Sequence, residues 1–271
     1  MSSRKQFIWS IISVVALLLS ASTRVASAQG DRPPGSVDAE AMKSIERMSE
    51  FLAAAKQFSV TADIGYDIVQ EWVQKIEFGE TRVLTVRRPD LFRVDTTDRD
   101  GSKNGVVFDG KAVEAFDLQA KVHAVANKPG SLDDAISYFV DQLGMRLPMA
   151  VIIQGRMPQM AKEWAQDVDY VDQSTIGGVP CDHVALHGEW EDVQLWIARG
   201  DKPLLHRMVI TYTRAEGKPQ FSANFENWSL SPDVPDSFFA FTPPEGFAQI
   251  PFKARTSGLQ AGAMKAQGGQ P

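Results

Sequence analysis

The stretch LTVRRPDLFRVDTTDRDGSKNGVVFDGKAVEAFDLQAKVHAVA, residues 84–126, indicates the fold class most directly. Leu84, Val86 and Arg88 share one face of a predicted strand, because side chains in a strand alternate with a period of two. Pro89 then ends the strand, and the alternation of apolar residues resumes directly after it. Asp-Gly and other turn residues separate the short apolar runs that follow. This pattern is typical of antiparallel strands joined by tight turns.

Arg88 ends the apolar face of this first strand, and two interpretations of it are open. Its side chain either reaches solvent at the strand end, as terminal arginines usually do, or faces an interior in which a cation has a function. The neighbouring Arg87 points to the opposite face in both cases.

Alternating runs of the same kind occur along most of the chain. They predict strands near residues 60–68, 72–88, 91–97, 104–109, 111–117, 120–126, 168–176, 181–188, 191–198, 204–214 and 219–230. Helical patterns cover residues 38–56 and 131–143, and Pro148 and Pro158 can each begin a short helix. About eleven strands without a regular βαβ rhythm predict a mainly β fold with helices, of the α+β class. We expect an incomplete antiparallel β-barrel with a helical plug or lid.

The N-terminal residues have the layout of a secretory signal peptide. Basic residues precede an apolar run at residues 7–19, and Ala26 and Ala28 supply the small residues that a signal peptidase requires. We therefore expect a signal peptide at residues 1–28, cleavage after Ala28 and a periplasmic location. A polar linker at residues 29–37, one domain at residues 38–252 and a disordered low-complexity tail at residues 253–271 are expected to follow.

The charge balance and the cysteine content limit the possible partners and cross-links. Without Arg4, Lys5 and Arg24 the 28 basic residues become 25, against 34 acidic residues, for a net charge of −9. Such a chain is not expected to bind nucleic acid. Cys181 is the single cysteine, so an intramolecular disulfide cannot form. We expect a monomer that is stabilised by its hydrophobic core.

The residues that could support a metal site or catalysis do not assemble into either. Cys181, His183 and His187 share one face of a predicted strand, but the first and last of them lie about 20 Å apart at the rise of a strand. They cannot hold one zinc ion together, and a small buried thiol beside a surface histidine is the better interpretation. The sequence contains no G-x-S-x-G nucleophile motif and no glycine-rich phosphate loop. We predict no metal, no cofactor and no enzymatic activity.

Three motifs resemble a known family of periplasmic proteins. VRRPDLFRVD, then VVFDGKAVEAFD, then FFAFTPPEGF occur in the order found in the periplasmic lipoprotein carriers of the LolA type, and they span most of the mature chain. The second half, GGVPCDHVALHGEWEDVQLWIARGDKPLLHRMVITY, is closer to a branch of uncharacterised predicted periplasmic proteins thought to share the LolA/LolB-like fold. The resemblance implies an incomplete antiparallel barrel whose helices close an apolar cavity for acyl chains.

The resemblance also implies a role for Arg88. In the carriers, the arginine before the proline of this hairpin bonds backbone carbonyls of the lid helices and holds the empty cavity closed, and Arg88 occupies that place. The predicted ligand-binding residues are this arginine and a set of apolar residues that would line the cavity. They are Arg88, Val60, Ile64, Tyr66, Leu84, Val86, Phe92, Met208, Ile210, Phe221 and Phe225.

Two functions follow as hypotheses. The first is a non-enzymatic periplasmic carrier for the acyl chains of a lipid or lipoprotein. The second is a structural or regulatory envelope protein that uses the same fold to bind a partner protein. In that case the apolar residues would form an ordinary filled core.

Overall fold

A computed structural model describes residues 35–142 and 147–252 of the chain. The strands are β1 (Gln57–Val69), β2 (Lys75–Arg87), β3 (Leu91–Asp98), β4 (Lys103–Asp109), β5 (Ala112–Asp117), β6 (Val122–Asn127), β7 (Ala165–Ile176), β8 (Val179–Gly188), β9 (Asp192–Ala198), β10 (Leu205–Thr211), β11 (Gln220–Ser229) and β12 (Ala248–Gln249). The helices are α1 (Ala39–Ala54), α2 (Leu132–Ser137), the π-helical η1 (Tyr138–Gln142), α3 (Ala150–Gln154), α4 (Met157–Trp164) and the 3₁₀-helical η2 (Asp236–Phe239).

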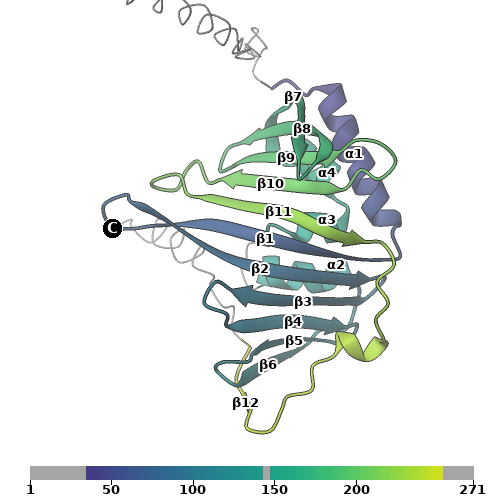
Figure 1. Ribbon diagram of the computed structural model, residues 1–271, viewed down its shortest axis with the longest axis vertical. Helices are drawn as coiled ribbons and strands as arrows, with labels where there is room; N and C mark the ends of the chain where they lie inside the picture. The colour runs from purple at the N-terminus through teal and green to yellow at the C-terminus, as the bar shows by residue number, and fades with distance from the viewer. Residues whose placement is uncertain (1–34, 143–146, 253–271) are drawn as a thin grey trace, which may run out of the picture. The chain divides into compact units, whose positions relative to one another are not determined.

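Within the described residues, all twelve strands belong to one sheet, in the order β12-β6-β5-β4-β3-β2-β1-β11-β10-β9-β8-β7 (Figure 1). Neighbouring strands are antiparallel, except that β12 runs parallel to β6. In this part of the chain the two outermost strands, β12 and β7, do not pair with each other. The expected mainly β fold with an incomplete antiparallel barrel is therefore confirmed, and β12 is the short strand that the sequence did not indicate.

The ends of the chain lie largely outside the described residues. The predicted signal peptide at residues 1–28, its cleavage site and the predicted tail at residues 253–271 are not described. The described end of the predicted linker pairs with the edge strand β7, because Val37 forms a parallel bridge with Val168. The amide of Asp38 also donates to the carbonyl of Val168 at 2.8 Å.

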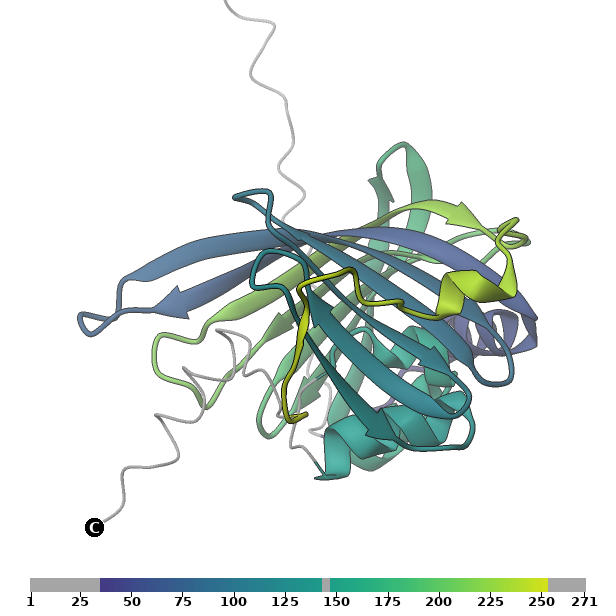
Figure 2. The same cartoon turned by 90° about the horizontal axis from the view of Figure 1, so that it is seen from below.

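The register of β2 with its two neighbours defines an inner face of the sheet. Leu84 lies between Val60 on β1 and Val94 on β3. The side chains of Leu84 and Val60 are each 1% exposed and belong to the core. Helices α1 to α4 lie against this inner face, as the two views together show (Figures 1 and 2). The core is thus a layer between the helices and one face of the sheet.

Helix α1 begins and packs as its sequence indicates. Asp38 caps it, since its carboxylate accepts from the amides of Glu40 and Ala41 at 2.8 and 3.2 Å. The helix buries an apolar stripe that includes Ile45, Met48 and Leu52. It contacts α3, α4 and strands β7 to β9.

The opposite, outer face of the sheet is covered in part by the segment that contains η2. Phe239 of η2 is 1% exposed, and the guanidinium of Arg93 on β3 lies 4.9 Å above the ring of Phe238. Farther along, Phe241 stacks on Phe116 of β5 with 4.1 Å between the ring centroids. The FFAFTPPEGF motif therefore contributes to the fold by covering the outer face.

The β1–β2 hairpin carries an exposed apolar tip. Trp72 is 89% exposed, and Val73 and Phe78 are 47% and 45% exposed. Figure 2 shows this hairpin extending past the neighbouring strands.

Candidate functional site

Arg88 follows directly after β2 and joins two helices on the inner face. Its Nη2 donates to the carbonyl of Ile153 at 2.6 Å and to the carbonyl of Leu52 at 3.3 Å. Leu52 lies in the last turn of α1 and Ile153 in the last turn of α3. Carbonyls at a helix C-terminus have no partner within the helix and carry the negative end of the helix dipole. A single guanidinium therefore stabilises both helix ends, which is the kind of contact that the family resemblance implies.

The surroundings of Arg88 are only partly polar. Burial lowers the pKa of its guanidinium, and the negative charge of Asp133 in α2 opposes this shift. The Nε of Arg88 is buried and has no hydrogen-bond partner among the described residues. The backbone of Arg88 is also fixed, because its amide donates to the carbonyl of Lys56 at 2.8 Å. Arg88 faces an interior, and the solvent-exposed strand end considered from the sequence is not what the structure shows.

Arg87 has its partners on the outer face. Its Nη1 pairs with the carboxylate of Asp236 at 2.5 Å, and its Nη2 donates to the carbonyl of Val234 at 2.5 Å. The same guanidinium lies 5.0 Å from the centre of the Phe239 ring. The alternation expected for these two arginines is present, but Arg87 is a structural contact of the η2 segment rather than a free strand end.

The apolar residues predicted to line a cavity are packed in the core. Nine of the ten are at most 6% exposed, and Tyr66 is half-buried and stacks on Phe78 with 6.2 Å between ring centroids. All ten lie within or against one continuous cluster that includes side chains of α1, α2, α3 and α4. The interior is therefore filled by helix side chains in this state, and a ligand-binding role of these residues stays a prediction.

Two hollows lie elsewhere among the described residues. One, of about 370 Å³, is lined by His206, Phe225 and Trp228 among others, and burial lowers the pKa of the His206 imidazole. The other, of about 340 Å³, lies beside Phe116 and Phe241. Of the ten predicted lining residues, Phe225 alone borders either hollow. Neither hollow is the apolar cavity that the resemblance implies.

The residues weighed for a metal site have other partners. Cys181 is fully buried, its thiol donates to the carbonyl of Val179 at 3.4 Å, and burial raises the pKa of the thiol. His183 stacks on Trp196 with 4.2 Å between the ring centroids, and His187 pairs with Asp192. No group of three metal-binding side chains occurs among the described residues. The expectation of a surface histidine at position 183 was wrong, because its side chain is 14% exposed.

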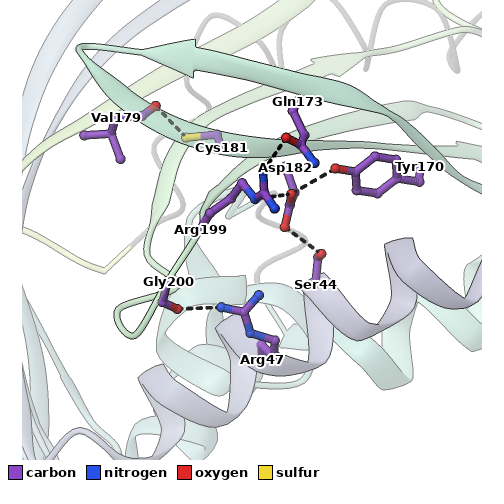
Figure 3. Close-up of polar contacts among 9 residues, drawn as sticks. All are labelled: Ser44, Arg47, Tyr170, Gln173, Val179, Cys181, Asp182, Arg199 and Gly200. Carbon is purple, nitrogen blue, oxygen red and sulfur yellow. Dashed lines mark hydrogen bonds and ion pairs between the residues drawn. The ribbon is translucent and has the colours of Figure 1, made fainter.

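A second polar contact to α1 was missed from the sequence. Asp182 is 6% exposed and accepts from the hydroxyls of Ser44 and Tyr170 at 3.1 and 2.9 Å (Figure 3). The Nε of Arg199 lies 3.3 Å from the same carboxylate. Asp182 lies on the same face of β8 as the buried Val184 and Leu186. An acidic residue on an apolar strand face was the sequence signal that could have predicted this contact.

Arg47 adds a further contact between α1 and the sheet. Its Nη2 donates to the carbonyl of Gly200 at 2.6 Å, just beyond β9 (Figure 3). Helix α1 is thus held near its N-terminus by Asp182, near its middle by Gly200 and at its C-terminal end by Arg88.

These features define a class of protein with an open antiparallel sheet, helices against its inner face and a cation that bridges two helix ends. The chain matches the model of the family described as predicted periplasmic protein (DUF2092) over residues 41–253, and it belongs to that family. The predicted relation to a branch of uncharacterised periplasmic proteins is therefore confirmed. None of the described helices is long and apolar enough to span a membrane.

The chain is also similar to solved structures at low sequence identity. An uncharacterised conserved protein from Thermus thermophilus is 9% identical, with a TM-score of 0.47 over 79% of this chain and 99% of that one. The lipoprotein LppX from Mycobacterium tuberculosis is 14% identical, with a TM-score of 0.44 over 73% and 100%. A LolA superfamily protein from Nitrosomonas europaea is 12% identical, with a TM-score of 0.36 over 74% and 97%. No curated protein matches the chain significantly.

Proposed function

We propose that the protein is a non-enzymatic periplasmic carrier that takes up the acyl chains of a lipid or lipoprotein between its helices and the inner face of its sheet. The observation that carries this proposal is the bridge from Arg88 to the carbonyls of Leu52 and Ile153. The bridge closes the helices over an interior made almost entirely of apolar side chains. Each methylene transferred from water into such an interior contributes about 0.8 kcal/mol.

Uptake requires helix side chains to leave the inner face, and α3 is the element suited to that movement. It has five residues, no side-chain cap at its N-terminus and a left-handed residue, Gly155, at its C-terminus. A helix of this length is not stable by itself and depends on its packing. Helix α1, in contrast, is held to the sheet by Ser44 and Arg47. Arg88 thus connects α3, which can move away from the sheet, to α1, which stays in place.

The test replaces Arg88 by leucine, which keeps an apolar side chain on this face of the strand. We expect the Arg88→Leu protein to remain folded by far-UV circular dichroism and to bind several times more of a hydrophobic fluorescent dye than the wild type. The lost bonds are charge-assisted and contribute about 1.5–3 kcal/mol each when well formed. The change therefore weakens the closed state, while the sheet keeps its strand pairs.

Arg87→Leu is the matched control, since it also loses a carbonyl contact and a stacked ring but touches only the outer face. Under conditions in which far-UV circular dichroism shows it to be folded, it is expected to bind dye as the wild type does. Equal dye binding by the two variants would show that Arg88 is an ordinary structural arginine and would remove the main support for a carrier.

A second candidate is a protein that binds a partner protein and holds no ligand. The filled interior favours it, because no rearrangement is then required. The exposed Trp72 at the hairpin tip offers such a partner an aromatic anchor. A protein of this kind would carry no lipid when isolated from its compartment.

A further inference from the structure

Glu80 and Arg82 form an ion pair on the inner face of β2. They lie on the same strand face as Leu84, and the register places them opposite Ile64 and Ala62 of β1, which are fully buried. The side chain of Glu80 is 11% exposed and that of Arg82 is 27% exposed. On β3 they lie opposite Asp98 and Thr96, so the pair lies where this face of the sheet changes from apolar to polar side chains.

This pair differs from the other polar contacts of the inner face because it lies within one strand. Arg88 joins α1 to α3, and Asp182 joins α1 to the sheet. Glu80 and Arg82 are two residues apart on β2, so their contact docks no element on another. Removing two charges from water costs free energy that a pair regains only with good geometry and further hydrogen bonds. Docking of one element on another therefore does not account for the cost of this pair.

Arg82 retains the capacity to bind one more acceptor. Its Nε is buried and has no hydrogen-bond partner in the part of the chain that the structure describes. A guanidinium presents its N–H groups in a planar fork that matches carboxylate and phosphate groups. A quarter of the side chain is exposed, so an anion can approach the guanidinium, and it reaches the buried Nε once the helix side chains leave the inner face.

We infer that Arg82 binds the anionic group of an amphiphile whose acyl chain lies along the inner face toward Arg88. The inference rests on the proposed carrier function and names its ligand class, an acyl chain that ends in a carboxylate or a phosphate. Leu84 and Val86 lie on the same face between the two arginines, which are separated by six residues, or about 20 Å of strand. Glu80 neutralises Arg82 while no anion is bound, and the anion engages the free Nε.

The experiment compares ligands that differ only in charge. Purified protein is titrated with hexadecanoic acid and its methyl ester, and with phosphatidic acid and the diacylglycerol of the same chains. The wild type is expected to prefer at least one acid over its uncharged partner, and the acid that is preferred identifies carboxylate or phosphate as the group bound. Arg82→Leu is expected to lose about tenfold in affinity for that acid, with little change for its uncharged partner. Glu80→Gln removes the competing carboxylate and is expected to strengthen binding of the acid.

Arg99→Leu is the control, because Arg99 pairs with Asp63 in the same region of the sheet but on the outer face. Equal losses for acid and ester in Arg82→Leu, or the same loss of acid in Arg99→Leu, would overturn the assignment. Should Arg82→Leu fail to fold, unchanged acid binding by Glu80→Gln would overturn it as well. If the wild type binds neither member of either pair, the carrier function itself falls, and the assignment falls with it.

Discussion

At the scale of single residues, three charged side chains on the inner face have distinct tasks. Arg88 stabilises two helix ends, Asp182 holds α1 against the sheet, and Arg82 keeps an unused donor. Each differs from its surroundings in the same way, as a polar group in phase with apolar neighbours. The role of each side chain depends on its hydrogen-bond and ion-pair partners, because a charge in an apolar layer is stable only when neighbouring groups compensate it.

Asp182 gives the prediction at this scale. Asp182→Ala leaves the hydroxyls of Ser44 and Tyr170 without their acceptor in a buried layer. We expect the free energy of unfolding to fall by about 2–4 kcal/mol, measured by urea denaturation. Arg199→Ala removes the exposed side of the same cluster, since the side chain of Arg199 is 47% exposed. It is expected to cost less than about 1 kcal/mol. Equal losses for the two variants would show that Asp182 does not anchor α1.

At the scale of elements, the C-terminal segment that contains η2 and β12 packs on the sheet and pairs with it. Phe239 is buried against the outer face. Strand β12 pairs in parallel with β6, and the amides of Ala248 and Ile250 donate to the carbonyls of Lys121 and His123 at 3.0 and 2.9 Å. Arg93 reinforces the segment by donating to the carbonyl of Phe238 at 3.0 Å. We therefore expect the segment to unfold together with the strands that it covers.

The corresponding prediction compares two large aromatic residues. Phe239→Ala removes a side chain that is 1% exposed and should lower the free energy of unfolding by about 3–5 kcal/mol. Trp72→Ser removes a larger side chain that is 89% exposed and should change it by less than about 0.5 kcal/mol. Urea denaturation followed by far-UV circular dichroism measures both. A small loss for Phe239→Ala would mean that the segment detaches without affecting the sheet.

At the scale of the whole molecule, the filled interior separates the two proposed functions. A carrier alternates between this state and one in which an acyl chain replaces helix side chains on the inner face, whereas a partner-binding protein keeps its core unchanged. Both functions are compatible with membership of a family described as periplasmic. The two functions therefore differ in whether a lipid occupies the interior, and not in the fold.

Occupancy is measured by native mass spectrometry of protein isolated from an envelope fraction. A carrier is expected to show, beside the mass of the chain, a second species heavier by the mass of a lipid, which disappears under denaturing conditions. Arg88→Leu should increase the share of that species, because it weakens the closed state. A single species in both proteins would favour the partner-binding function instead.

The sequence by itself determined the fold class, most strand positions and the direction of several side chains. The alternation around Pro89 placed Arg88 and Arg87 on opposite faces, and the Asp-Gly pairs marked hairpin turns that the structure contains. These features are local, since strand phase and turn conformation depend on residues close together in the chain. The same reasoning indicated an interior of apolar side chains.

Only the tertiary structure decided which groups each of these side chains contacts. The bond from Arg88 to Ile153 joins residues 65 positions apart, and that from Ser44 to Asp182 joins residues 138 positions apart. The sequence pattern of an apolar face is the same whether it lines a cavity or packs against helices, because both keep water away. The filling of the interior, the isolation of the Glu80–Arg82 pair and the docking of Phe239 depend on how distant elements pack, and that packing is set by the whole chain at once.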